Sequence, residues 1–250
     1  MSEDIILQTS GLTKEFKGFA AVQDVDLKVK RGHIHALIGP NGAGKTTVFN
    51  LLTKFLQPTT GIIQFNGIDI TKEEPAQIAR RGVVRSFQIS ATFPHLSVME
   101  NVRVALQRKM GTSFHFWSSQ SSLNVLNDRA VELLESVDLG AFIDTQAVDL
   151  PYGRKRALEI ATTLALEPEL MLLDEPTQGM GHEDVDLVVE LIRKVSKGRT
   201  ILMVEHNLSV VETLSNVITV LQRGSILAEG TYDVVSKDPR VMEAYLGVEA

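Results

Sequence analysis

The apolar and polar positions of this chain follow a strand-like period near the start and helical periods further on. Between residues 4 and 38, three β-branched stretches with partial alternation predict strands. Residues 46–56 instead place apolar side chains at the spacing of one helix face. The predicted early strands lie at 5–9, 22–29, 33–38, 61–67 and 83–88, and the fourth of them closes with the turn pair Asn66-Gly67.

The middle of the chain is predicted to be helical, and the last third alternates between strands and helices. Residues 170–173 form a short apolar run that ends in two acids, which is the pattern of a buried parallel strand. Helices are predicted at 98–110, 125–137, 154–166, 183–197 and 207–214, and late strands at 200–206, 217–224 and 225–230.

This order of elements predicts an α/β fold. Strands that alternate with helices favour a largely parallel sheet. A helical block interrupts the alternation, so we expect one domain with an inserted second lobe. The expected nucleotide-binding core comprises 1–88 and 168–250, and the expected helical lobe comprises 89–167.

One glycine-rich segment has the spacing of a phosphate-binding loop. It matches G-x-x-x-x-G-K-[ST], follows an apolar run and opens a helical pattern, which is the context such a loop requires. Glycines let backbone N–H groups wrap phosphates, Lys45 supplies a positive charge and Thr46 offers a hydroxyl to Mg²⁺. The candidate loop consists of Gly39, Pro40, Asn41, Gly42, Ala43, Gly44, Lys45, Thr46 and Thr47.

Asp174 and Glu175 follow the buried strand directly. Adjacent carboxylates at such a position repel each other unless a cation or a proton relieves them. A Mg²⁺ ion beside the phosphate loop would do so, with Asp174 orienting the metal and Glu175 acting as base toward the attacking water. Without the loop, the same pair would be read as a solvated strand end.

Two further polar residues end predicted strands. His206 ends 200–206, and parallel strands direct their carboxyl ends to one ligand-binding edge, so a γ-phosphate contact is expected; a plain loop histidine is the alternative. Asn207 is a candidate helix cap. Gln88 ends the strand before the helical lobe and is a candidate metal or water ligand, or a surface amide.

Composition and charge narrow the function classes. The 250 residues carry a net charge of −6, which gives no strong basic field, so we expect no nucleic-acid partner. The absence of cysteine excludes disulfides and thiolate metal sites. The start lacks the apolar core of a signal peptide, and no apolar run approaches the roughly 20 residues of a membrane span. A membrane role would therefore go through a partner.

The predicted helix that follows Pro151 begins with three cations, at Arg154, Lys155 and Arg156. The N-terminus of a helix carries partial positive charge, so cations there are unfavourable unless an anion compensates. Either an anion arrives from another molecule, or Lys155 or Arg156 pairs locally with Glu159. Both explanations can hold together.

With these motifs in order, the whole chain resembles the nucleotide-binding subunit of ATP-binding cassette (ABC) transporters. The resemblance implies a P-loop NTPase with a RecA-like core sheet, an N-terminal antiparallel β subdomain and an inserted helical lobe. It implies ATP and Mg²⁺ as ligands, with Thr46, Gln88 and Asp174 at the metal, Glu175 as base and His206 as the switch histidine. Phe16 stands where the family stacks an aromatic ring on adenine; strand core is the alternative for it.

The cationic helix start corresponds to the family's signature segment, a Leu-Ser-Gly-Gly-Gln pattern that caps ATP held by the other cassette of a head-to-tail dimer. The last four positions of this pattern are occupied here by Pro151, Tyr152, Gly153 and Arg154. Among these four, only the second glycine of the pattern is kept. We expect Arg154 to face the partner's nucleotide. Gly181 replaces the aspartate that the family usually has in the loop after the acidic pair, which puts coupling between the two sites in doubt.

Five short segments look like those of branched-chain amino acid importer ATPases. They are the Tyr-Gly pair at 152–153, EIA at 159–161, GMG at 179–181, VEHN at 204–207 and DPRVMEAYLG at 238–247. That resemblance implies an ATPase at the cytoplasmic face of the cell membrane, paired with itself or a paralogue. Its further partners would be integral membrane permease subunits and, indirectly, a periplasmic or extracellular substrate-binding protein. An importer of urea or another substrate, and a soluble regulatory or repair ATPase, are the alternatives.

Overall fold

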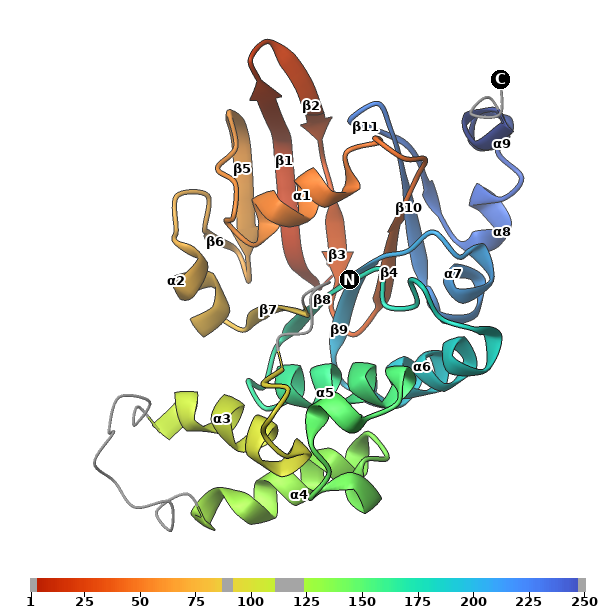
Figure 1. Cartoon of the computed structure of the whole chain (residues 1–250). Helices are drawn as coiled ribbons and strands as arrows, with labels where there is room; N and C mark the ends of the chain where they lie inside the picture. Colours follow the sequence, from red (N-terminus) through yellow and green to blue (C-terminus); the bar gives the residue numbers. More distant parts are fainter. Residues whose placement is uncertain (1–3, 87–91, 111–123, 247–250) are drawn as a thin grey trace. The chain divides into compact units, whose positions relative to one another are not determined.

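The computed structural model describes residues 4–86, 92–110 and 124–246. Contacts group the chain into two compact units. The first contains 1–85, 169–175 and 196–250, and the second contains 86–168 and 176–195. Figure 1 labels the helices and strands of both units.

The first unit contains an antiparallel sheet built mostly from the N-terminal strands. Its order is β2-β1-β5-β6, and β3 also pairs with β1. The turn predicted at Asn66-Gly67 connects β5 to β6, and both of its residues have positive φ, as a two-residue hairpin turn requires. The strands are β1 (Ile5–Phe16), β2 (Phe19–Val25), β3 (Lys28–Lys30), β5 (Thr60–Phe65) and β6 (Ile68–Asp69).

The strand predicted over 22–29 is wrong as a single element, because it divides into β2 and β3. The division lies opposite Gly11, which adopts φ 57° in the middle of β1. Asp26, between the two short strands, accepts a hydrogen bond of 2.6 Å from the Gly11 backbone N–H. The Asp26 side chain therefore supplies the acceptor for the Gly11 N–H at the point where strand pairing with β1 is interrupted.

The same unit contains the second sheet, of order β11-β10-β4-β9-β8-β7. Strands β10, β4, β9 and β8 pair in parallel, and every residue of β4, β8 and β9 is buried; β8 confirms the buried parallel strand predicted at 170–173. The strands are β4 (Ile34–Ile38), β7 (Val83–Ser86), β8 (Leu170–Asp174), β9 (Thr200–Val204), β10 (Val217–Gln222) and β11 (Ser225–Gly230).

Helix α1 (Lys45–Leu52) joins the core of this unit. Its residues Val48, Phe49, Leu51 and Leu52 are buried in one apolar cluster with side chains of both sheets. Of the short helices of the unit, the sequence pattern predicted α1 and α7 but not α2, α8 and α9, because helices of four to eight residues show too few turns of periodicity. The bounds of the remaining short helices are α2 (Pro75–Arg80), α7 (Leu208–Leu214), α8 (Tyr232–Val235) and α9 (Pro239–Leu246).

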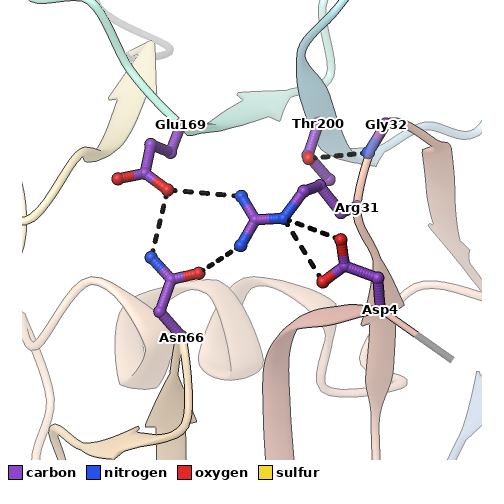
Figure 2. Close-up of polar contacts among 6 residues, drawn as sticks. All are labelled: Asp4, Arg31, Gly32, Asn66, Glu169 and Thr200. Carbon is purple, nitrogen blue, oxygen red and sulfur yellow. Dashed lines mark hydrogen bonds and ion pairs between the residues drawn. The ribbon is translucent and has the colours of Figure 1, made fainter. Parts of the chain in front are cut away.

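Arg31 joins three separate segments of the first unit in a polar cluster (Figure 2). Its guanidinium contacts Asp4, Glu169 and the Asn66 side-chain oxygen, and the Asn66 amide donates to Glu169 at 3.0 Å. The cluster ties the start of β1 and the β5–β6 turn to the start of β8. Because the side chains are partly exposed, we expect only a small contribution to stability.

The second unit is helical. Helix α5 packs against α3, α4 and α6 within it. Its elements are α3 (Val98–Met110), α4 (Asn127–Ser136), the 3-10 turns Gly140–Phe142 and Ala147–Asp149, α5 (Tyr152–Leu164) and α6 (His182–Val195). None of the helices in the described ranges is long and apolar enough to cross a membrane.

The helical unit is larger than the expected lobe of 89–167, because it also contains 86–88, 168 and the segment 176–195 with α6. Gly153 permits this packing: a Cβ atom at that position would lie 2.6 Å from a carboxylate oxygen of Asp184 in the first turn of α6. A side chain at 153 would therefore require the Asp184 carboxylate to move from its present position.

His35 is a buried histidine in the core sheet. Its Nε2 lies 2.7 Å from the Thr219 hydroxyl, and that hydroxyl donates its proton to Glu229 at 2.6 Å. The Thr219 oxygen is therefore the acceptor, and His35 carries its proton on Nε2. Burial, and next the neighbouring His33, lower the pKa of His35 from 6.5 to about 4.

We expect this pKa difference to make stability depend on pH. Between about pH 6.5 and 4 the unfolded chain binds a proton at His35 and the folded chain does not. The free energy of unfolding should therefore fall as pH drops through this window, by up to about 3 kcal/mol from His35. Urea unfolding of wild type and His35→Gln at pH 7 and 4.5 measures it, with the exposed His95→Gln as control. Equal pH dependence in wild type and His35→Gln would contradict the assignment.

Candidate nucleotide-binding site

The candidate phosphate loop connects the buried strand β4 to α1. Gly39 has φ 147°, and a Cβ atom there would lie 2.1 Å from the Leu221 carbonyl oxygen. Gly44 has φ 103°, and its Cβ would lie 2.6 Å from the Ala21 carbonyl oxygen. Neither position accommodates a side chain, so packing against β10 and β2 as well as phosphate binding accounts for these glycines.

Lys45 begins α1 and folds back over the loop. Its Nζ donates to the carbonyl oxygens of Gly39 at 2.6 Å and Pro40 at 3.0 Å, and the residue is only 8% exposed. Burial lowers the pKa of Lys45, and the negative charge of Glu175 opposes that effect. The loop lysine and the predicted base are therefore close enough to interact electrostatically. Thr46, next in the helix, is exposed.

A cavity of about 590 Å³ lies against the outer face of the loop. Asn41 and Gly42 are exposed there. The backbone of the loop is therefore accessible from this side. The lining residues are Pro40, Asn41, Gly42, Ala43, Gln222, Arg223, Leu227, Arg240, Glu243 and Ala244.

The register of the core sheet brings the acidic pair to the same edge as the loop. Val204 of β9 pairs with Leu37 of β4 on one side and with Asp174 of β8 on the other. Glu175 has a φ of 45°, and its N–H donates to the Val204 carbonyl at 2.9 Å. This backbone turn holds the half-buried Glu175 beyond the strand, while Asp174 is 2% exposed.

His206 extends from the same edge with its side chain 56% exposed. The preceding residue, Glu205, is fully buried, and its Oε1 accepts the backbone N–H groups of His206 at 2.9 Å and Asn207 at 3.1 Å. Asn207 caps α7, as predicted. Sequence reasoning missed Glu205; a carboxylate at the end of an otherwise apolar strand was the available signal.

Phe16 lies at the end of β1 and is 43% exposed, so the strand-core alternative is wrong. The Lys14 ammonium lies 5.2 Å from its ring centre. Phe19, paired with Phe16 across the hairpin, is 69% exposed and offers a second aromatic surface. Adenine stacking by Phe16 stays a prediction. Gln88 lies outside the described residues.

The cationic start of α5 is compensated within its own unit. Arg154 donates to the Asp138 carbonyl at 2.7 Å and lies 5.3 Å from the centre of the Phe142 ring. Arg156 pairs with Glu159, which confirms the predicted local pairing. The Asp184 carboxylate lies against the first turn at Gly153. Intramolecular contacts therefore account for much of the unusual charge pattern.

Pro151 and Tyr152 stand at the start of α5, before Arg154. Pro151 is the N-cap of α5, where its side chain accepts no hydrogen bond. Tyr152 is 57% exposed, and its hydroxyl donates to the Gln178 carbonyl at 3.3 Å. The start of α5 is therefore tied to the loop that follows the acidic pair.

Comparisons with known proteins agree with this geometry. The family described as ABC transporter matches residues 22–178, and a family described as branched-chain amino acid ATP-binding cassette transporter matches residues 225–250. The chain is an ATP-binding cassette of the ABC transporter family. This membership confirms the resemblance and the expected P-loop NTPase fold.

Relatives of this cassette match it over nearly its whole length. The high-affinity branched-chain amino acid transport ATP-binding protein BraF of Pseudomonas aeruginosa is 40% identical, with 97% of this chain and 98% of BraF covered. The corresponding LivG of Escherichia coli is 38% identical at the same coverage. A crystal structure of the ADP conformation of an ABC transporter cassette has a TM-score of 0.84 at 29% identity, covering 97% of this chain and 99% of that one.

The donors at the site fit a magnesium ion bound together with nucleotide. The Thr46 hydroxyl and the Asp174 carboxylate are hard oxygen ligands, and Mg²⁺ is usually held by one or two carboxylates plus phosphates. Bound Mg²⁺ would neutralise phosphate charge. The cassette itself would contribute the N–H groups of the loop, the Lys45 ammonium and the carboxylates of Asp174 and Glu175.

Proposed function

We propose that this cassette is the ATP-hydrolysing subunit of an importer for branched-chain amino acids or related amino acids or small amides. The main support for ATP hydrolysis is the shared edge of the core sheet. The phosphate loop, Asp174, Glu175 and His206 all follow strands at this edge. The names and full-length similarity of BraF and LivG support the cargo class.

Each residue has a defined task in this proposal. The loop amides and Lys45 bind the β- and γ-phosphates, and Thr46 with Asp174 and Gln88 holds Mg²⁺. Glu175 accepts a proton from the attacking water, and His206 contacts the γ-phosphate. Phe16 stacks on adenine.

The proposed assembly is a head-to-tail dimer with a second cassette, either the same chain or a paralogue. In it, residues 151–154 cap the nucleotide of the partner cassette. Permease subunits hold the pair at the cytoplasmic face of the membrane, and a substrate-binding protein outside the cell delivers the cargo. The contacts of Arg154 with Asp138 and Phe142 mean that any contact with the partner's nucleotide must compete with an existing one.

Uptake measurements test the cargo. Deleting the gene in cells that encode this chain is expected to abolish high-affinity uptake of labelled leucine, isoleucine and valine. Wild type should restore uptake and Lys45→Met should not, with uptake of an unrelated sugar as the control. Loss of urea uptake alone would reassign the cargo, and unchanged uptake of all these compounds would contradict an importer role.

A further inference from the structure

Arg85 is the last residue of the first unit before the segment that contains Gln88, and its side chain bridges two elements of the nucleotide site. One guanidinium nitrogen forms an ion pair with Asp174 Oδ2, and Nη1 donates to Asn50 Oδ1 at 2.7 Å. The guanidinium carbon also lies 5.7 Å from the centre of the Phe49 ring. The side chain is 10% exposed and that of Asp174 is 2% exposed, so water screens this ion pair weakly.

The contact with α1 reaches the face of the helix that carries Thr46. Asn50 follows Thr46 by four residues, and positions i and i+4 lie on the same side of a helix, one above the other. Arg85 therefore connects the Asp174 carboxylate to the helix face with the candidate metal-binding hydroxyl. A planar guanidinium with donors in fixed directions is suited to hold two acceptors in one geometry, which a lysine ammonium is not.

We propose that Arg85 is a positioning residue for the Mg²⁺–nucleotide site. It fixes the Asp174 carboxylate relative to α1 and thereby sets how much Mg²⁺ strengthens ATP binding. This inference rests on the proposed function, since it assumes that ATP binds at the loop with Mg²⁺. If Arg85 only competed with Mg²⁺ for Asp174, its removal would increase the effect of Mg²⁺ on ATP binding. If Arg85 were only a structural contact, its removal would change stability alone.

The measured quantity is the ratio of the ATP dissociation constants in EDTA and in excess Mg²⁺, obtained by equilibrium titration. Arg85→Met is expected to lower this ratio by about 10- to 100-fold, the usual cost of removing a group that orients a metal ligand. ATP affinity in EDTA should stay near the wild-type value, because the phosphate loop is unchanged. Arg85→Lys should recover only part of the ratio, since it keeps the charge and loses the bridge.

Asn50→Ala separates positioning from folding. It removes the α1 end of the bridge and leaves the Arg85–Asp174 ion pair, so we expect a smaller fall in the same ratio and a folded protein. Arg31→Met is the matched control, because Arg31 also bridges an asparagine and a carboxylate, before the amino end of β4 (Figure 2). It should change the unfolding temperature only slightly and leave the ratio unchanged.

The outcomes distinguish this inference from the proposed function. Failure of wild type to bind ATP, or to bind it more tightly with Mg²⁺, would overturn the proposed function. With wild type behaving as expected, an unchanged or increased ratio in folded Arg85→Met would overturn the positioning role. An Asn50→Ala ratio equal to wild type would contradict the bridge if Arg85→Met does not fold.

Discussion

Replacing Lys45 with methionine is expected to weaken ATP binding by about 10²- to 10³-fold, the largest affinity loss available from one side chain of the loop. Charge-assisted hydrogen bonds contribute about 1.5–3 kcal/mol each, and the proposed contacts of Lys45 with the β- and γ-phosphates would supply one or two of them, so a loss of about 3–4 kcal/mol is expected. The lysine also donates to the carbonyl oxygens of Gly39 and Pro40, so its loss removes an internal brace of the loop. Methionine keeps the aliphatic packing of this 8% exposed residue.

Lys54→Met is the matched control for that prediction. Lys54 is also a buried lysine near α1, where burial lowers its pKa to about 8, and it donates to the Thr71 carbonyl at 2.9 Å. Its replacement should alter stability and leave the ATP affinity of the folded protein unchanged. Calorimetric titration with ATP, with thermal unfolding to verify folding, makes the comparison. Near-normal affinity in Lys45→Met would overturn the phosphate-loop assignment.

Glu175→Gln is expected to reduce ATP hydrolysis by about 10²- to 10⁴-fold, the usual contribution of a positioned general base. Glutamine keeps the shape of the side chain and removes its ability to accept a proton. The backbone turn that holds residue 175 depends on its N–H bond to Val204, so the substitution should not disturb it. ATP binding should survive, and an ATP-bound dimer should accumulate on size-exclusion chromatography.

Glu183→Gln is the control for the loss of a carboxylate in the same region of sequence, because Glu183 is exposed in the first turn of α6. Its phosphate release rate should equal that of wild type. Retained turnover in Glu175→Gln would move the base role elsewhere, and His206 would be the next residue to test.

Features that depend on neighbours in sequence were predictable. The phosphate loop, the buried strand before Asp174 and Glu175, the Asn66-Gly67 turn and the Asn207 cap all follow from residues within a few positions of one another. Short-range periodicity and turn chemistry determine such elements, since the required φ values and hydrogen bonds are local.

Long-range contacts decided the rest. The break between β2 and β3 depends on Gly11, and the exposure of Phe16 is a property of the folded hairpin. The cations at the start of α5 suggested an anion from another molecule, but Asp138, Glu159 and Asp184 supply compensation within the unit.

The bridge from Arg85 to Asp174 spans 89 positions of sequence, and that from Arg85 to Asn50 spans 35. No periodicity or motif predicts such a pair. An arginine in a strand can be solvated or can pair with an acceptor anywhere else in the chain. The sequence by itself determined the chemistry of the phosphate loop and the acidic pair. Only the tertiary structure decided which charged side chains hold that chemistry in place, since their partners come together only when the sheet and α1 pack.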